Sequence, residues 1–375
     1  MYNKGDMEGK NLDVRTINDS EIIVADDVFS VLPAKISEAS SDGAILVVFD
    51  KNLKDIATRV ADGLRPLRRK LFICALDKTK VQSDVLPEYI RYIVAVGCGF
   101  AALKADVLAR RLNVGWSLVL TAPTTDTILQ GKSPKQVFID TNMMINCPKR
   151  CLAAGFGILY SRRLSEFEGA FAKKVLARDD TCFVPFEIKG EVSPVSLAMY
   201  LLEISAIKTY DDSADIVARV LYQKALADGK KPRLVGEYKF IASSYLLTLY
   251  SHLLASPAID VMPPPDAVAA FDALEKIGCK NFCDASKRID FFEINGYFRI
   301  SYILSEYRTD LIEQLSSLDM RKYGRAWRRI YDDAGFSLKS AVTADDMRFA
   351  TMLAGSVSDN LLGYAYATGA LTRVA

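Results

Sequence analysis

The first third of the chain alternates short apolar runs with segments whose apolar residues recur at helical spacing. The runs are AILVVFD, LFICAL, YIRYIVAVG, SLVLTAP and QVFID. Each run is almost continuously apolar, as in strands that are buried on both faces of a parallel sheet. We therefore expect an α/β domain with a parallel sheet over residues 1–150. Before these runs, EIIVADDVFSVLPAKI predicts a short strand followed by a helix.

The pattern changes after about Arg150. Long segments such as CLAAGFGILYSRRLSEFEGAFAKKVLA and MRFATMLAGSVSDNLLGYAYATGAL carry apolar residues at helical spacing. Only FFEIN and FRISYIL suggest strands in this part, and no low-complexity linker separates the two halves. We predict a second, all-α domain over residues 151–375.

Charge and hydropathy exclude several kinds of partner. The formal net charge is +2, which is too small to create a broad field that recruits nucleic acid or an anionic membrane. Lys104 interrupts the best candidate for an apolar span, and the polar N-terminus lacks the apolar centre of a signal peptide. We expect a cytoplasmic protein without a nucleic-acid or membrane partner. The basic segment RKYGRAWRR fits a nucleic-acid contact or a solvated helix face, and we favour the helix face.

Histidine and cysteine usage limits the possible chemistry. His252 is the single histidine, so a site with several histidine ligands cannot form. The seven cysteines include two CxxxC pairs, Cys147 with Cys151 and Cys279 with Cys283, which lack zinc-ribbon spacing and partner histidines. We expect reduced thiols that pack as small apolar side chains.

The run IVAVG leads into a glycine turn, GCGF, and then into a helix. Small residues at such a turn let backbone N–H groups approach a phosphate, and the helix N-terminus adds positive potential. Tight packing alone would also explain the turn, and GxGxxG is not matched because Ala102 holds its last position. Binding crevices of parallel sheets lie at the carboxyl ends of the strands. This rule groups Asp50, the turn 97–99 and the segment 121–126 around one crevice.

The order of four segments resembles a known superfamily over roughly residues 40–165. The segments are ILVVFDKNLKDIATRVADGLR, IVAVGCGFAALKADVLARRLN, LVLTAPTTD and VFIDTNMMINCPKRCLAAGFGILYS. They resemble dehydroquinate synthase, glycerol dehydrogenase and glycerol-1-phosphate dehydrogenase, the superfamily that includes the iron-containing alcohol dehydrogenases. The resemblance implies a Rossmann-like parallel sheet, an all-α C-terminal domain and an NAD or NADP cofactor. It also implies an oxidoreductase or cyclase-like activity on a small polyol or phosphorylated polyol, and we expect a homo-oligomer.

The resemblance places the cofactor at the ends of the strands. Asp50 would face the adenosine ribose, the glycine turn would hold the pyrophosphate, and three threonines would line the crevice. The implied cofactor-binding residues are Asp50, Gly97, Cys98, Gly99, Thr121, Thr124 and Thr125. Asp50 could instead cap the next helix, and the threonines could be ordinary turn residues.

The chain departs from the family at the metal site. The family's metal ligands are an aspartate and two histidines, and their positions fall here at Ile158, Tyr238 and Pro264. These residues cannot hold a divalent ion, so we expect no metal and no metal-assisted catalysis. Phe100 also replaces a small residue after the glycine turn, where its ring could crowd a phosphate.

Two functions from different classes remain open. One is a nicotinamide-nucleotide-binding enzyme that works without the metal, with Tyr238, Lys239 and His252 as candidate acid–base groups. His252, a lone histidine in a helix, is more commonly a packed or surface residue. The alternative is a catalytically inactive pseudoenzyme that is retained as a structural or regulatory partner. The direction of the Phe100 side chain separates the two, because a ring inside the turn would block a dinucleotide.

Overall fold

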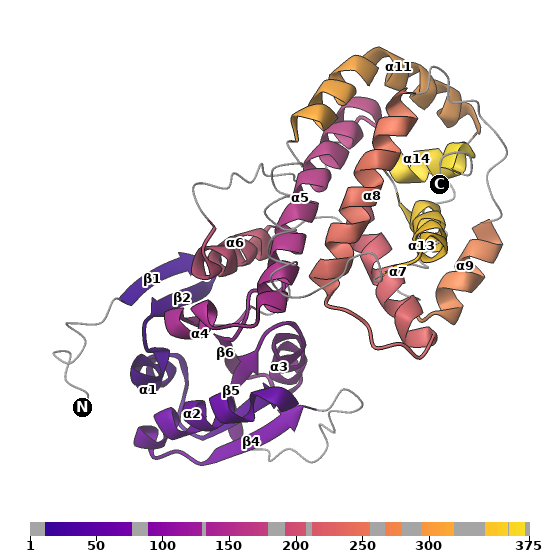
Figure 1. Cartoon of the computed structure of the whole chain (residues 1–375). Coiled ribbons are helices and arrows are strands. Elements are labelled where there is room, and N and C mark those ends of the chain that lie inside the picture. Colours follow the sequence, from indigo (N-terminus) through magenta and orange to yellow (C-terminus); the bar gives the residue numbers. More distant parts are fainter. Residues whose placement is uncertain are drawn as a thin grey trace. The chain divides into compact units, whose positions relative to one another are not determined.

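The computed structural model describes residues 12–76, 89–129, 133–178, 192–207, 212–255, 267–279, 294–318, 342–358 and 360–371 (Figure 1). The chain divides into two compact units, Met1–Gly155 with Ile188–Ile207 and Phe156–Glu187 with Lys208–Ala375. A single boundary at residue 150 was predicted, whereas the segment 188–207 belongs with the first unit. The sequence motifs VMPPPDA and RKYGRAWRR lie outside the described residues, apart from Ala267.

The first unit contains a seven-stranded sheet in the order β1-β2-β7-β6-β5-β3-β4. The strands are β1 (Leu12–Ile17), β2 (Ser20–Ala25), β3 (Ala44–Asp50), β4 (Leu71–Leu76), β5 (Ile90–Gly97), β6 (Gly115–Leu120) and β7 (Gln136–Asp140). All neighbouring strands are parallel except β1 and β2. The predicted parallel α/β domain is therefore confirmed. The sequence analysis did not predict β1, which is mostly exposed and carries no apolar run.

Helices cover both faces of this sheet and explain the continuous apolar runs. On one face lie α1 (Val28–Ala39) and α2 (Lys54–Leu64). Two short 3-10 segments, Lys51–Leu53 and Arg65–Leu67, flank α2. On the other face lie α3 (Gly99–Leu112), α4 (Thr141–Ile145) and α6 (Pro194–Ala206). Within β3, Ile45 and Val47 pack toward α1 and α2, whereas Leu46 and Val48 pack toward α3. Alternation with a period of two thus buries every apolar residue of the run.

Strand β4 differs from the prediction of a buried strand. LFICAL does form a strand, but its Ile73 is 53% exposed and Cys74 is exposed as well. The reason is its place in the sheet, because β4 is an edge strand that pairs only with β3 among the described strands. Hydrophobicity alone does not separate an edge strand from a central one.

The second unit is helical, as predicted. Its described helices are α5 (Lys149–Val175), α7 (Ser213–Ala227), α8 (Val235–Ala255), α9 (Ala267–Lys276), α11 (Ile294–Ser317), α13 (Ala344–Val357) and α14 (Leu361–Ala367). The first seven residues of α5 belong to the first unit. The suggestion of a strand at FRISYIL was wrong, since this segment lies in α11. Ile300, Ile303 and Leu304 contact the hydrophobic core at helical spacing. None of the described helices is long and apolar enough to cross a membrane.

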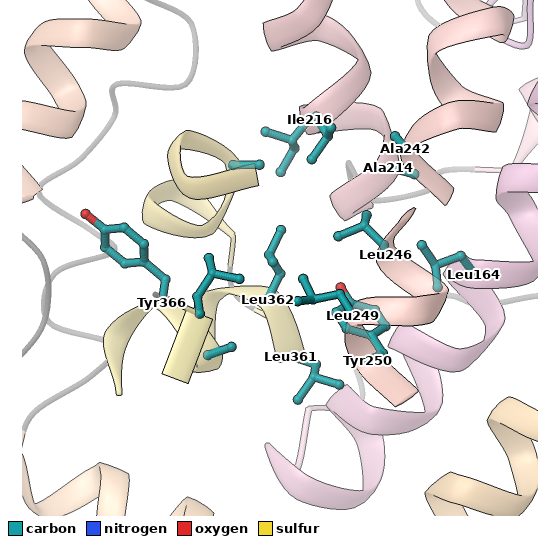
Figure 2. Close-up of a cluster of buried hydrophobic side chains, with 14 of the residues drawn as sticks. Leu164, Ala214, Ile216, Ala242, Leu246, Leu249, Tyr250, Leu361, Leu362 and Tyr366 are labelled. Carbon is teal, nitrogen blue, oxygen red and sulfur yellow. The ribbon is translucent and has the colours of Figure 1, made fainter. Parts of the chain in front are cut away.

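The core of the helical unit is assembled from helices far apart in the sequence. Figure 2 shows side chains from α5, α7, α8 and α14 converging around Leu246, Leu249 and Leu362. α5 and α8 run side by side in Figure 1, and a Cβ atom added to Gly157 would lie 2.0 Å from the carbonyl oxygen of Gly236. This contact requires glycine at 157, because any side chain would force the two backbones apart.

Gly157→Ala is expected to lower the free energy of unfolding by about 1–3 kcal/mol, the usual cost of overpacking a core. Gly99→Ala is the matched control, because the nearest atom to its added Cβ, in Thr125, lies at an ordinary 3.7 Å. Urea titrations followed by circular dichroism measure both variants. Equal stability of the two variants would contradict the close helix contact.

Candidate functional site

The connections of β3 and β5, two neighbouring strands, run in opposite directions across the sheet. The chain leaves β3 through α2 for the outer strand β4, and it leaves β5 through α3 for β6 on the opposite side. β3 and β5 are neighbours, so their carboxyl ends form a topological switch point, where sheets of this type bind ligands. Asp50 ends β3 and Gly97 ends β5.

The structure brings the predicted strand-end residues together. Gly97 has φ +147°, and a Cβ atom there would lie 2.7 Å from Asp50 Oδ2 and 2.8 Å from Ala101 Cβ. The Asp50 carboxylate therefore lies directly against the glycine turn, which admits no side chain at 97. The Thr121 amide donates to the Gly97 carbonyl over 3.1 Å, which fixes the end of β6 beside the same turn.

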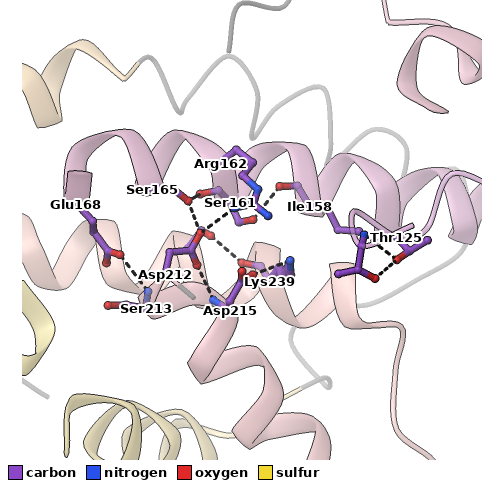
Figure 3. Close-up of polar contacts among 12 residues, drawn as sticks. Thr125, Ile158, Ser161, Arg162, Ser165, Glu168, Asp212, Ser213, Asp215 and Lys239 are labelled. Carbon is purple, nitrogen blue, oxygen red and sulfur yellow. Dashed lines mark hydrogen bonds and ion pairs between the residues drawn. The ribbon is translucent and has the colours of Figure 1, made fainter. Parts of the chain in front are cut away.

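The first turn of α3 faces this crevice without a side-chain cap. Cys98 is the N-cap residue, yet within the described structure its side chain makes no capping hydrogen bond. Thr125 lies beside Gly99 at van der Waals distance, and its Oγ1 accepts from the Thr127 amide at 3.3 Å (Figure 3). An uncapped helix start offers N–H groups and positive potential to an anion.

Cysteine thiols gather at the same end of the sheet. Burial raises the pKa of the Cys98 thiol, and the nearby negative charge of Asp50 raises it further. Burial, together with Cys151 and Cys98, raises the pKa of Cys147 to about 12. These thiols are therefore neutral at physiological pH and add no negative charge that would repel a phosphate.

Phe100 lies in the first turn of α3. Its ring is partly buried against the hydrophobic cluster that α3 forms on its face of the sheet. The Lys104 ammonium lies 5.5 Å from the centre of the ring.

The positions implied for metal ligands do not fit a metal ion. Ile158 lies on α5, is 1% exposed and has no donor atom. Tyr238 lies on α8, where its hydroxyl accepts from the Arg233 amide at 3.4 Å, and Pro264 lies outside the described residues. No group of three histidine, cysteine or carboxylate side chains in the described part of the chain could hold a metal.

Buried ion pairs lie next to these positions instead (Figure 3). Arg162, one turn after Ile158, approaches Asp212 Oδ2 at 3.9 Å. Lys239, the residue after Tyr238, contacts Asp215 Oδ1 at 2.6 Å. All four charged side chains are buried, and their charges sum to zero. The two cations are therefore compensated inside the helical unit.

Glu168 extends this network with a carboxyl group that favours its protonated form. Its Oε2 accepts from the Ser213 amide and from Asn360 Nδ2, each at 3.0 Å, and its Oε1 lies 2.5 Å from Tyr250 Oη. Burial, and then the charge of Asp212, raises the pKa of Glu168 to about 8. Burial, and then Asp215, raises the pKa of Asp212 to about 6. Desolvation thus dominates both carboxyl groups.

The structure does not bring all the candidate acid–base groups together. Tyr238 and Lys239 are consecutive on α8, but Tyr238 packs edge-on against Tyr222 whereas Lys239 pairs with Asp215. His252 is exposed and lies thirteen residues beyond Lys239 on α8, about 20 Å along the helix axis. His252 therefore cannot act on the same atom as Lys239 unless the helix unfolds.

Sequence reasoning missed the buried charged residues of α5 and α7. Asp212 caps α7 by accepting from the Asp215 amide at 2.7 Å. A usable signal was the recurrence of Ser161, Ser165 and Glu168, which places these polar side chains on one face of the helix.

Comparison with known proteins identifies the fold. The sequence matches no protein-family model and no curated protein. Among solved structures, maleylacetate reductase from Agrobacterium tumefaciens is similar over 96% of this chain and 97% of its own, with 12% identity and a TM-score of 0.51. Glycerol dehydrogenase from Schizosaccharomyces pombe is similar over 83% of this chain and 90% of its own, with 12% identity and a TM-score of 0.44. A 2-epi-5-epi-valiolone synthase, ValA from Streptomyces hygroscopicus subsp. jinggangensis 5008, is similar over 82% and 99%, with 11% identity and a TM-score of 0.42.

At this level of identity the comparisons show the fold alone. The chain has the dehydroquinate synthase-like fold, with an α/β domain and an α-helical domain, as the sequence predicted.

Glu168→Gln is expected to flatten the pH dependence of stability. The native pKa of about 8 lies above the ordinary value of 4.5, so the native state retains a proton that the unfolded state loses. The wild-type free energy of unfolding should therefore fall as pH rises from about 4.5 to about 8, and between pH 6 and 8, above the pKa of about 6 of Asp212, the variant should lack this fall. Urea titrations between pH 5 and 9 measure it. Glu166→Gln, two residues earlier on α5, should keep the wild-type slope, and an unchanged slope in Glu168→Gln would refute a protonated Glu168.

Proposed function

We propose that the protein binds a nicotinamide dinucleotide, NAD or NADP, at the carboxyl ends of β3 and β5. The observation that carries the proposal is the uncapped first turn of α3, which begins at the glycine turn of the switch point. A pyrophosphate there would accept from backbone N–H groups and gain from the helix dipole. The Cys98 thiol is neutral and the Phe100 ring packs against the hydrophobic cluster of α3, so backbone N–H groups would bind the pyrophosphate.

Asp50 supports a preference for NAD over NADP. Its carboxylate lies against the glycine turn, within reach of a ribose whose pyrophosphate sits on α3. A carboxylate accepts hydrogen bonds from ribose hydroxyl groups and repels a 2′-phosphate. Thr124 and Thr125 supply further hydroxyl groups at the same strand end.

When bound, the cofactor would supply hydride chemistry, and the resemblance implies a small polyol or phosphorylated polyol as the substrate. This chain would have to move the substrate's proton without a metal, because Ile158 supplies no ligand atom. Tyr238 and Lys239 are the candidates for that transfer, since they are adjacent on α8. Lys239 would need to leave Asp215 before it could accept or donate a proton.

A specific observation also favours a second candidate function, a catalytically inactive pseudoenzyme. The cations nearest the implied metal positions, Arg162 and Lys239, face Asp212 and Asp215. Such paired cations offer little electrophilic help to a substrate oxygen. In this case the nucleotide would be a structural or regulatory ligand.

Calorimetric titration with NAD⁺, NADH, NADP⁺ and NADPH is expected to give micromolar binding, tighter for NAD than for NADP. Gly97→Ala should weaken binding at least tenfold, because its Cβ would collide with Asp50 and Ala101. Asp50→Asn should lose the discrimination against NADP while it keeps the backbone site. Cys74→Ala, at an exposed thiol in the same unit, is the control and should bind like the wild type.

Absence of binding to the folded wild-type protein at millimolar nucleotide would refute the proposal. Hydride transfer separates the two candidate functions once binding is established. Absorbance at 340 nm, followed with glycerol or glycerol phosphate and with or without Zn²⁺, reports turnover. Turnover without metal supports the enzyme, and binding without any turnover supports the pseudoenzyme.

A further inference from the structure

A cavity of about 370 Å³ opens at the carboxyl ends of β2 and β7, within the first unit. Its walls come from the residues between β2 and α1, from α2, and from the end of β7 together with α4. The volume lies within the range of about 300–1,000 Å³ that is usual for small-molecule sites. The lining includes Asp27, Ile56, Arg59, Asn142, Met143 and Asn146.

Two segments that are far apart in the sequence are tied together at this cavity. The Asp140 carboxylate accepts from the Val28 amide at 3.1 Å and from the Met143 amide at 2.8 Å, so it joins the start of α1 to α4. The Asp26 carboxylate accepts from Thr141 Oγ1 at 2.7 Å. Both carboxylates belong to the lining, and their hydrogen bonds hold its walls in place without a ligand.

Asp27 and Arg59 line the cavity with opposite charges that are not paired with each other. Asp27 is exposed and precedes α1, but its side chain makes no capping hydrogen bond. The Arg59 guanidinium lies over the Phe29 ring, 4.0 Å from its centre. A guanidinium in such a position keeps N–H groups that can bind a carboxylate. Neither Asp27 nor Arg59 forms an ion pair within the part of the chain that the structure describes.

Two asparagine side chains add hydrogen-bond acceptors to the lining. Asn142 Nδ2 donates to the Asp26 carbonyl and Asn146 Nδ2 donates to the Asn142 carbonyl, each at 2.8 Å. Because the nitrogens bind backbone carbonyls, the amide oxygens remain as acceptors, and no described residue donates to them. With the carboxylate of Asp27 they offer three acceptor groups, as many as an ammonium has N–H donors.

Ile56 and Met143 give the cavity an apolar side. Both side chains are half-buried and pack against the hydrophobic cluster on the α1 and α2 face of the sheet. The unbranched methionine side chain adapts to neighbours of different shape. A short aliphatic chain in the cavity would remove more apolar surface of both residues from water.

We propose that this cavity binds a free aliphatic α-amino acid. The ammonium of the ligand would donate to Asp27 and to the two amide oxygens, and its carboxylate would accept from Arg59. Its side chain would lie against Ile56 and Met143. A ligand that carries both charges can pair with Asp27 and with Arg59 at once. The inference does not rest on the proposed nucleotide site, because the two sites share no residue.

Calorimetry with glycine, L-alanine and L-leucine tests the proposal at neutral pH and constant ionic strength. All three should bind, with an affinity that rises from glycine to leucine as more apolar surface is buried. Isoamylamine, which is leucine without its carboxylate, and isocaproate, which is leucine without its ammonium, should each bind at least tenfold more weakly than leucine. Absence of binding by all three amino acids at millimolar concentration would refute the site.

Two variants assign the charged groups of the ligand. Arg59→Gln should lower the affinity for leucine to that for isoamylamine, without weakening isoamylamine itself. Asp27→Asn should lower the affinity for leucine to that for isocaproate, without weakening isocaproate. Both residues are exposed, and Asp27 does not cap α1 with its side chain, so both variants should fold like the wild type.

Two matched controls keep the outcomes distinct. Arg65→Gln and Asp19→Asn make the same charge changes at exposed positions of the same unit, outside the cavity, and should leave leucine binding unchanged. Equal weakening by Arg59→Gln and Arg65→Gln would overturn the site, since binding would then follow net charge. Equal affinity of the wild type for leucine and isoamylamine would overturn the amino-acid assignment and leave a simple amine as the ligand.

Discussion

The arrangement of helices in the helical unit depends on the buried contact between Lys239 and Asp215. Two opposite charges have been taken out of water at 2.6 Å, with Arg162 and Asp212 close by. Removing one member of such a pair leaves an uncompensated buried charge, which costs about 3–5 kcal/mol. The pairs therefore tie α5, α7 and α8 to one arrangement, and the close approach at Gly157 fixes the distance between α5 and α8.

This arrangement shows what occupies the region where the resemblance would place metal ligands. A divalent ion adds positive charge and gathers ligands from separate helices. Here side-chain cations supply positive charge beside the implied ligand positions, and carboxylates of the same unit neutralise it. The crevice at the ends of β3 and β5, where we propose a nucleotide, is built differently, because backbone conformation at Gly97 and an uncapped helix make it. The charges of the helical unit and the crevice of the sheet are thus built from separate parts of the chain.

The sequence predicted the central sheet because burial on both faces makes β3, β5, β6 and β7 continuous apolar runs. It did not predict β1, and it did not predict the exposure of β4, since edge strands need no such run. The strand-end residues were predicted because parallel strands bring their carboxyl ends to one edge. The buried charges of Arg162, Asp212 and Asp215 could not be predicted in the same way. Periodicity shows which face of a helix is polar, but it does not show which residue of another helix lies opposite.

Neither unit is a single continuous segment of the chain, so neither can be expressed alone as one simple fragment. Residues 188–207 return to the first unit, so the polypeptide passes between the two units three times. Ala198 and Leu202 of α6 complete the hydrophobic layer that covers one face of the sheet. No single cut can therefore yield either unit whole, and a gene fragment that ends near residue 155 would encode a sheet with part of its apolar face uncovered.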